Sequence, residues 1–125
     1  MTSDQPRPLV LIVEDDPFVR LFGADVLENA GFAVIEASNA AEALEVLDSR
    51  SDVKVVFTDV EMPGELNGLG LTRQIRMRWP EISIVVTSGR MAPMQDELAL
   101  QDRFVPKPYS PGALVRCIES LIVAR

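Results

Sequence analysis

Residues 9–17 read Leu-Val-Leu-Ile-Val-Glu-Asp-Asp-Pro, an apolar run that is followed by three acids and a proline. Its apolar half shows no polar alternation, which is typical of a strand that is buried on both faces. Asp16 and Pro17 then supply an N-cap residue and a proline at the first helical position. The stretch therefore predicts a buried strand that passes directly into a helix, with acidic side chains at the junction.

The same unit of a strand followed by a helix recurs along the chain. The apolar runs predict strands at residues 9–13, 32–36, 53–57, 82–86 and 104–105. Capping signals and helical spacing predict helices at about residues 17–30, 40–47, 68–78, 93–100 and 111–124. This alternation predicts an α/β fold, a flavodoxin-like doubly wound five-stranded parallel sheet of order 2-1-3-4-5 with five helices.

Length and composition indicate one ordinary globular domain. The chain has 125 residues, of which 47% are hydrophobic and 25% charged. We expect residues 1–125 to form a single domain, with a core at about residues 8–124 and no output domain. No apolar run approaches the ~18 residues that cross a bilayer, and the first residues do not resemble a leader, so no membrane association is expected.

Charge and residue usage exclude several classes of function. The net charge of −7 opposes binding to nucleic acid. The chain contains no histidine, which excludes histidine-based catalysis and histidine metal ligands. Its single cysteine, Cys117, cannot form an internal disulfide, which fits a reducing compartment, and we expect a cytoplasmic location.

The residues that carry chemistry share one position, the end of a predicted strand. They are Glu14, Asp15, Asp59, Thr87 and Lys107. In an open parallel sheet these strand ends meet at one edge, where ligands bind. We therefore expect carboxylates, a hydroxyl and an ammonium group to converge in one crevice.

Grouped carboxylates repel one another unless a cation intervenes. Oxygen ligands without histidine or cysteine favour a hard cation, Mg²⁺ rather than Zn²⁺. Mg²⁺ and Lys107 together would neutralise a phosphate, to which Thr87 could donate a hydrogen bond. A carboxylate such as Asp59 can act as the nucleophile and form an aspartyl phosphate.

Five short motifs, in this order and spacing, resemble the receiver domain of two-component response regulators, which is CheY-like. They lie at residues 11–17, 58–64, 67–68, 85–89 and 105–109. The resemblance covers nearly the whole chain and implies that Asp59 is the phosphoacceptor. The phosphoryl group would come from a sensor histidine kinase or a histidine phosphotransfer protein. The resemblance also implies a signalling module, not an enzyme, that catalyses only its own phosphorylation and dephosphorylation.

The resemblance further implies a set of Mg²⁺ ligands. Asp15 and Asp59 would bind the metal directly, and Glu14 would bind it through water. The backbone carbonyl of Glu61 would be a further ligand. The loop at residues 64–68 is one residue longer than the commonest version in the family, and this removes no ligand.

A switch is implied by the same resemblance. Lys107 would pair with the phosphoryl group and precede a cis peptide to Pro108, and Thr87 would move toward the phosphoryl oxygens. Phe104 would then rotate inward and alter the face of the fourth helix, fifth strand and fifth helix, where a downstream protein target would bind. Phe104 replaces the frequent tyrosine, and an aromatic strand residue is also commonly just core. A homodimer through this face is left open.

Two other functions compete with a phosphorylated receiver. One is a phosphatase or hydrolase with Asp59 as nucleophile, but a dehalogenase-type enzyme needs a second aspartate where this chain has Glu61. The other is a protein-binding module that is not phosphorylated, against which the intact acid, threonine and lysine set argues. A flavin-binding protein of this fold is disfavoured because acids after the first strand would repel its phosphate. A phosphorelay shuttle, an allosteric regulator and a receiver from a longer protein all remain open.

Overall fold

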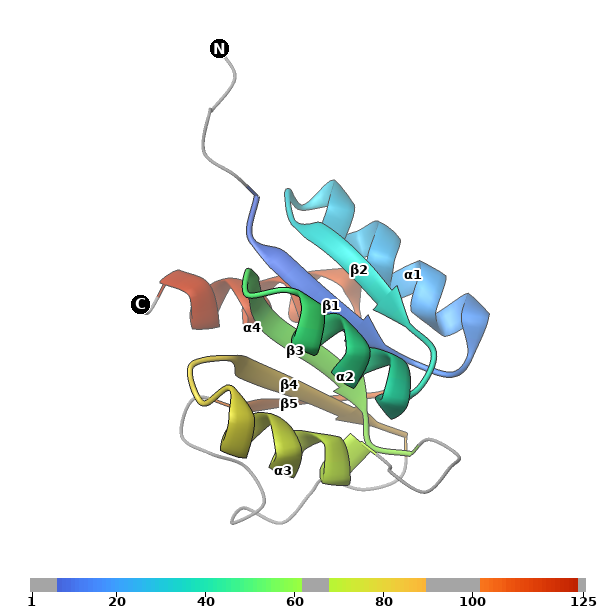
Figure 1. Ribbon diagram of the computed structural model, residues 1–125. Helices are drawn as coiled ribbons and strands as arrows, with labels where there is room; N and C mark the ends of the chain where they lie inside the picture. The colour runs from blue at the N-terminus through green and yellow to red at the C-terminus, as the bar shows by residue number, and fades with distance from the viewer. Residues whose placement is uncertain (1–6, 62–67, 90–101, 124–125) are drawn as a thin grey trace.

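The computed structural model describes residues 7–61, 68–89 and 102–123. The strands are β1 (Leu9–Val13), β2 (Ala33–Ala37), β3 (Val53–Asp59), β4 (Ser83–Ser88) and β5 (Arg103–Pro106). The helices of this part of the chain are α1 (Pro17–Asn29), α2 (Ala40–Ser49), α3 (Gly68–Arg78) and α4 (Pro111–Val123). All neighbouring strands pair in parallel in the order β2-β1-β3-β4-β5, which confirms the predicted sheet (Figure 1).

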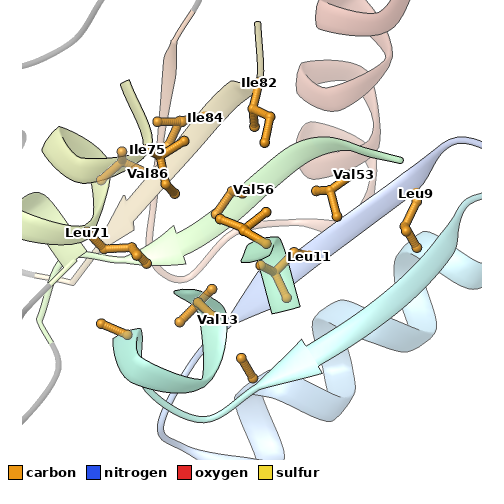
Figure 2. Packing of buried hydrophobic residues seen from close by; sticks show 14 residues of the cluster. Leu9, Leu11, Val13, Val53, Val56, Leu71, Ile75, Ile82, Ile84 and Val86 are labelled. Atoms are coloured by element: carbon orange, nitrogen blue, oxygen red, sulfur yellow. The ribbon is translucent and has the colours of Figure 1, made fainter. Parts of the chain in front are cut away.

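Helices cover both faces of the sheet, as the apolar strands require (Figure 1). On one face α2 and α3 pack over alternate residues of β1, β3 and β4, including Leu11, Val56 and Ile84 (Figure 2). On the other face α1 and α4 pack over the intervening residues, including Ile12 and Phe57. The two clusters make the sheet a rigid layer that holds the ends of its strands in place.

The structure moves the ends of several predicted strands. The strands β3 and β4 run further than predicted, so Asp59 and Thr87 belong to the strands and do not follow them. The reason is backbone pairing, because Asp59 lies opposite Thr87 in the parallel ladder. The predicted helix at residues 93–100 lies outside the described residues. The label α4 therefore belongs to the helix predicted at about residues 111–124, which is the fifth predicted helix.

The helix boundaries follow the predicted capping signals. Asp16 accepts hydrogen bonds from the backbone N–H groups of Phe18 and Val19 at 2.9 and 3.2 Å. Asn39 accepts one from Glu42 N–H at 2.8 Å and is therefore the N-cap residue of α2. Each such cap contributes about 1 kcal/mol to stability.

Gly68 brings the first turn of α3 into direct contact with the end of β3. Its backbone N–H donates to the carbonyl of Val60 at 3.2 Å. A Cβ at this position would lie 1.9 Å from the main-chain oxygen of Asp59. No side chain fits there, so glycine allows α3 to pack against the last residue of β3.

We expect Gly68→Ala to lower the free energy of unfolding by about 1–3 kcal/mol, because the new methyl group forces α3 away from β3. Urea denaturation of the full chain measures this change. The matched control is Gly112→Ala in α4, where the new Cβ meets only the flexible guanidinium end of Arg116, at 3.0 Å. Equal stability of the two variants would contradict the assigned contact.

Candidate functional site

Three carboxylates meet at the edge where the parallel strands end. Glu14 follows β1, Asp15 comes next, and Asp59 ends β3. One oxygen from each of the three lies within 4.8 Å of the other two. Glu14 and Asp59 are buried, whereas Asp15 is exposed. The structure thus brings together the acids that the sequence placed at two different strand ends.

Lys107, which follows β5, joins two of these acids. Its Nζ donates to Glu14 Oε1 at 2.9 Å and to Asp59 Oδ2 at 2.7 Å. Its backbone N–H donates to the carbonyl of Ser88 at 2.9 Å, which anchors it beside β4. The peptide bond from Lys107 to Pro108 is cis, as the resemblance implied.

The charges of this cluster do not balance. Among the residues that the structure describes, these three carboxylates pair with one ammonium group, that of Lys107, so negative charge is left over. Burial raises the pKa of Glu14, and the hydrogen bond from Lys107 only partly opposes this effect. Burial also lowers the pKa of Lys107, but its hydrogen bonds to Asp59 and Glu14 outweigh this and raise that pKa to about 12. A hard divalent cation with oxygen ligands fits both the leftover charge and the donor atoms.

Thr87 lies directly beside Asp59, as its partner in the β3–β4 ladder. Its carbonyl accepts a hydrogen bond from the N–H of Val60 at 2.9 Å. Its side-chain hydroxyl is buried and has no hydrogen-bond partner among the described residues. A buried hydroxyl without a partner costs free energy, so this position favours a ligand that accepts the hydrogen bond.

Glu61 contacts the site in a way that sequence reasoning missed. Its backbone N–H donates to Asp59 Oδ1 at 2.9 Å. Its carboxylate accepts hydrogen bonds from Ser88 Oγ at 3.0 Å and from Gly89 N–H at 3.3 Å. This side chain therefore links the segments that follow β3 and β4. The link joins distant parts of the chain, and no local signal in the sequence indicates it. The predicted role of the Glu61 carbonyl as a metal ligand stays a prediction.

Phe104 lies in β5 opposite Val86, one position before the level of Thr87. Its ring is half-buried and packs against the cluster beneath α2 and α3. Of the face predicted to signal to a target, the structure describes β5 and α4, and the predicted helix at 93–100 lies outside the described residues. The structure thus places Phe104 near Thr87 along the sheet.

Arg20, in α1, contacts the acidic segment after β1. Its Nη1 donates to the main-chain carbonyl of Glu14 at 2.9 Å, and its Nε donates to Glu36 Oε1 at 3.1 Å. Sequence reasoning missed this residue as well. One feature of the sequence could have indicated it: a basic residue one helical turn after the N-cap residue Asp16 lies near the segment that precedes the helix.

An apolar rim borders the site on α1. Phe18 is 83% exposed, and Leu21 and Phe22 are also exposed, although all three occur at helical spacing. The buried residues of α1 are instead Gly23, Ala24 and Leu27. A hollow of about 520 Å³ lies between this rim and the end of β5. It is lined by Phe18, Val19, Phe22, Gly89, Lys107, Pro108 and Tyr109.

Comparison with known proteins agrees with this geometry. The family model of the response regulator receiver domain matches residues 10–119. The chemotaxis protein CheY1 of Helicobacter pylori is 34% identical over 90% of this chain and 95% of its own length. The sensor kinase CckA of Brucella abortus is 33% identical over 90% of this chain, which spans only 12% of that protein. The transcriptional regulatory protein AruR of Pseudomonas aeruginosa is 34% identical over 92% of this chain and 49% of its own length.

A solved structure shows the same fold over the same range. A response regulator receiver protein from Sinorhizobium medicae superposes with a TM-score of 0.88 at 26% identity, covering 98% of each chain. In the part of the chain that the structure describes, no helix has the length and apolar character needed to cross a membrane. The sequence match, the sheet order and the solved relative all indicate the same family. The chain therefore belongs to the family of response regulator receiver domains of two-component systems.

Proposed function

We propose that this receiver domain accepts a phosphoryl group on Asp59 from a phosphohistidine of a sensor kinase or a phosphotransfer protein. The observation that carries this proposal is the position of the Asp59 carboxylate, which accepts a hydrogen bond from Lys107 Nζ and lies within 4.8 Å of the two acids after β1. That position combines a nucleophile, a fixed positive charge and a set of metal ligands. A hydrolase is less well supported, because Glu61 directs its carboxylate to Ser88 and Gly89.

The transfer step uses the residues of this chain in distinct roles. A carboxylate oxygen of Asp59 attacks the phosphorus, so that a P–O bond forms. The P–N bond of the partner's phosphohistidine breaks, and its electron pair returns to the imidazole nitrogen. Lys107, whose pKa is about 12, stays charged and can pair with a phosphoryl oxygen. The hydroxyl of Thr87, which has no hydrogen-bond partner among the described residues, can donate to another phosphoryl oxygen.

Glu14, Asp15, Asp59 and the carbonyl of Glu61 are the residues that would hold Mg²⁺. When bound, Mg²⁺ supplies positive charge that offsets the crowded carboxylates and the incoming phosphoryl oxygens. The hydrogen bond from Glu61 N–H to Asp59 Oδ1 orients the nucleophile. We propose that the domain signals through its own phosphorylation. We also propose that residues 1–125 form one functional unit and that its partners are cytoplasmic.

The donor protein must cover the rim of this site in order to bring its histidine to Asp59. Phe18 and Phe22 line the same hollow as Lys107. Large exposed apolar side chains beside a reactive group are typical of a protein interface. We therefore place the docking surface for the phosphodonor on the α1 rim, apart from the output face near Phe104.

The role of Asp59 as the phosphoacceptor is tested by incubating the protein with acetyl phosphate and Mg²⁺ and then measuring its intact mass. We expect the wild type to gain one phosphoryl group and Asp59→Asn to gain none, because the nucleophile is lost. The matched control is Asp52→Asn, whose carboxylate lies just before the opposite end of β3 and should leave the gain unchanged. A gain in Asp59→Asn, or none in the wild type with any donor, would sink the proposal.

Docking is tested with Phe18→Ala. We expect this change to slow transfer from a phosphorylated donor protein by roughly tenfold, since a large apolar contact at the proposed docking surface is lost. The rate with acetyl phosphate should be unchanged, because the small donor does not cover the rim. Met77→Ala on α3 is the matched control, as Met77 is 84% exposed and belongs to a different helix. Equal slowing with both donors would place Phe18 in the chemistry instead.

The switch is tested by hydrogen exchange of β5 with and without phosphorylation. We expect exchange at the backbone N–H groups of residues 103–105 to change in the wild type, because Thr87 moves and Phe104 follows. In Thr87→Ala the phosphoryl group should still be gained, but the change in β5 should be absent. Thr72→Ala, which removes a buried hydroxyl from α3, should keep the change. A persistent change in Thr87→Ala would show that Thr87 does not couple the site to β5.

A further inference from the structure

Arg20 forms a bridge between the segment after β1 and the end of β2. Its guanidinium reaches the carbonyl of Glu14 at 2.9 Å and the carboxylate of Glu36 at 3.1 Å. The Arg20 side chain is only 21% exposed, so the fork is held against the protein surface. A planar guanidinium with two partners on different elements is well suited to fixing their relative positions.

The carbonyl that Arg20 holds belongs to the peptide unit that joins Glu14 to Asp15. The N–H of Glu14 is also held, because it donates to the carbonyl of Ala37 at 3.0 Å. Both backbone groups of Glu14 are therefore occupied, one by β2 and one by α1. This fixes the peptide plane from which the Asp15 side chain projects, and it fixes the start of the Glu14 side chain.

We propose that Arg20 is a positioning residue for the two metal-binding acids Glu14 and Asp15, and that it sets the affinity of the site for Mg²⁺. This inference rests on the proposed Mg²⁺ site. Residues that orient metal ligands by hydrogen bonds commonly govern metal affinity. Arg20 acts through the carbonyl of Glu14, not through contact with the metal or the phosphoryl group.

Arg20 could act on Mg²⁺ binding through its charge or by positioning the ligands, and these two roles change the affinity for Mg²⁺ in opposite directions. A nearby cation repels Mg²⁺, so Arg20 acting by charge alone would weaken the binding of the metal. Its removal would then tighten Mg²⁺ binding. If Arg20 holds the ligands in place, its removal loosens the Glu14–Asp15 peptide and weakens Mg²⁺ binding.

The test is calorimetric titration of the full chain with Mg²⁺ alone. We expect Arg20→Ala to raise the Kd for Mg²⁺ by roughly tenfold. Arg20→Lys keeps the charge but lacks the fork, and it should raise the Kd in the same direction. The matched control is Arg50→Ala, which breaks an exposed ion pair with Asp52 away from the site and should leave the Kd unchanged.

Thermal unfolding separates positioning from loss of structure. The melting temperature without Mg²⁺ shows whether each variant folds. If Arg20→Ala does not fold, Arg20→Lys still tests the inference. A wild type that binds Mg²⁺, with Arg20 variants that bind it equally well or more tightly, would overturn this inference alone. A folded wild type that shows no Mg²⁺ binding would overturn both this inference and the proposed metal site.

Discussion

Three carboxylates repel one another at the carboxyl edge of the sheet, and the hydrogen bonds and packing around them have to offset that repulsion. Glu14 and Asp59 are buried there, and each shares the single ammonium group of Lys107. Burying charge costs free energy unless the charge is paired and hydrogen-bonded. The neighbouring backbone meets this requirement, since the N–H groups of Asp16 and Glu61 donate to the two acids.

The sheet supplies the rigidity that holds this crowded cluster together. The central strands β1, β3 and β4 are covered on both faces, so a shift of one of their ends would disturb two packed cores. Gly68 adds a direct backbone contact between α3 and Asp59. The sheet also connects the site to β5, because Thr87, Val86 and Phe104 lie on adjacent positions of β4 and β5. A change at Asp59 therefore has a short physical path to β5.

Local sequence patterns determined the architecture of this protein. The apolar run at residues 9–13, followed by acids and a cap at Asp16, predicted the first strand and helix, because burial and capping are decided within a few residues. Repetition of that unit predicted the parallel sheet and its order. Because parallel strands end at one edge, the sequence alone also predicted that Glu14, Asp59 and Lys107 lie near one another.

Tertiary structure alone decided the contacts between segments that are distant along the chain. Sequence periodicity could not show that Phe18 faces outward, since helical spacing marks an apolar stripe without saying what covers it. Nor could it show that Glu61 reaches Ser88 or that Arg20 holds the carbonyl of Glu14. These contacts depend on how the helices and loops sit around the sheet, and that placement is set by packing across the whole core. Local patterns in the chain were enough to predict which groups meet at the edge, whereas the way each group is held depends on contacts between distant segments.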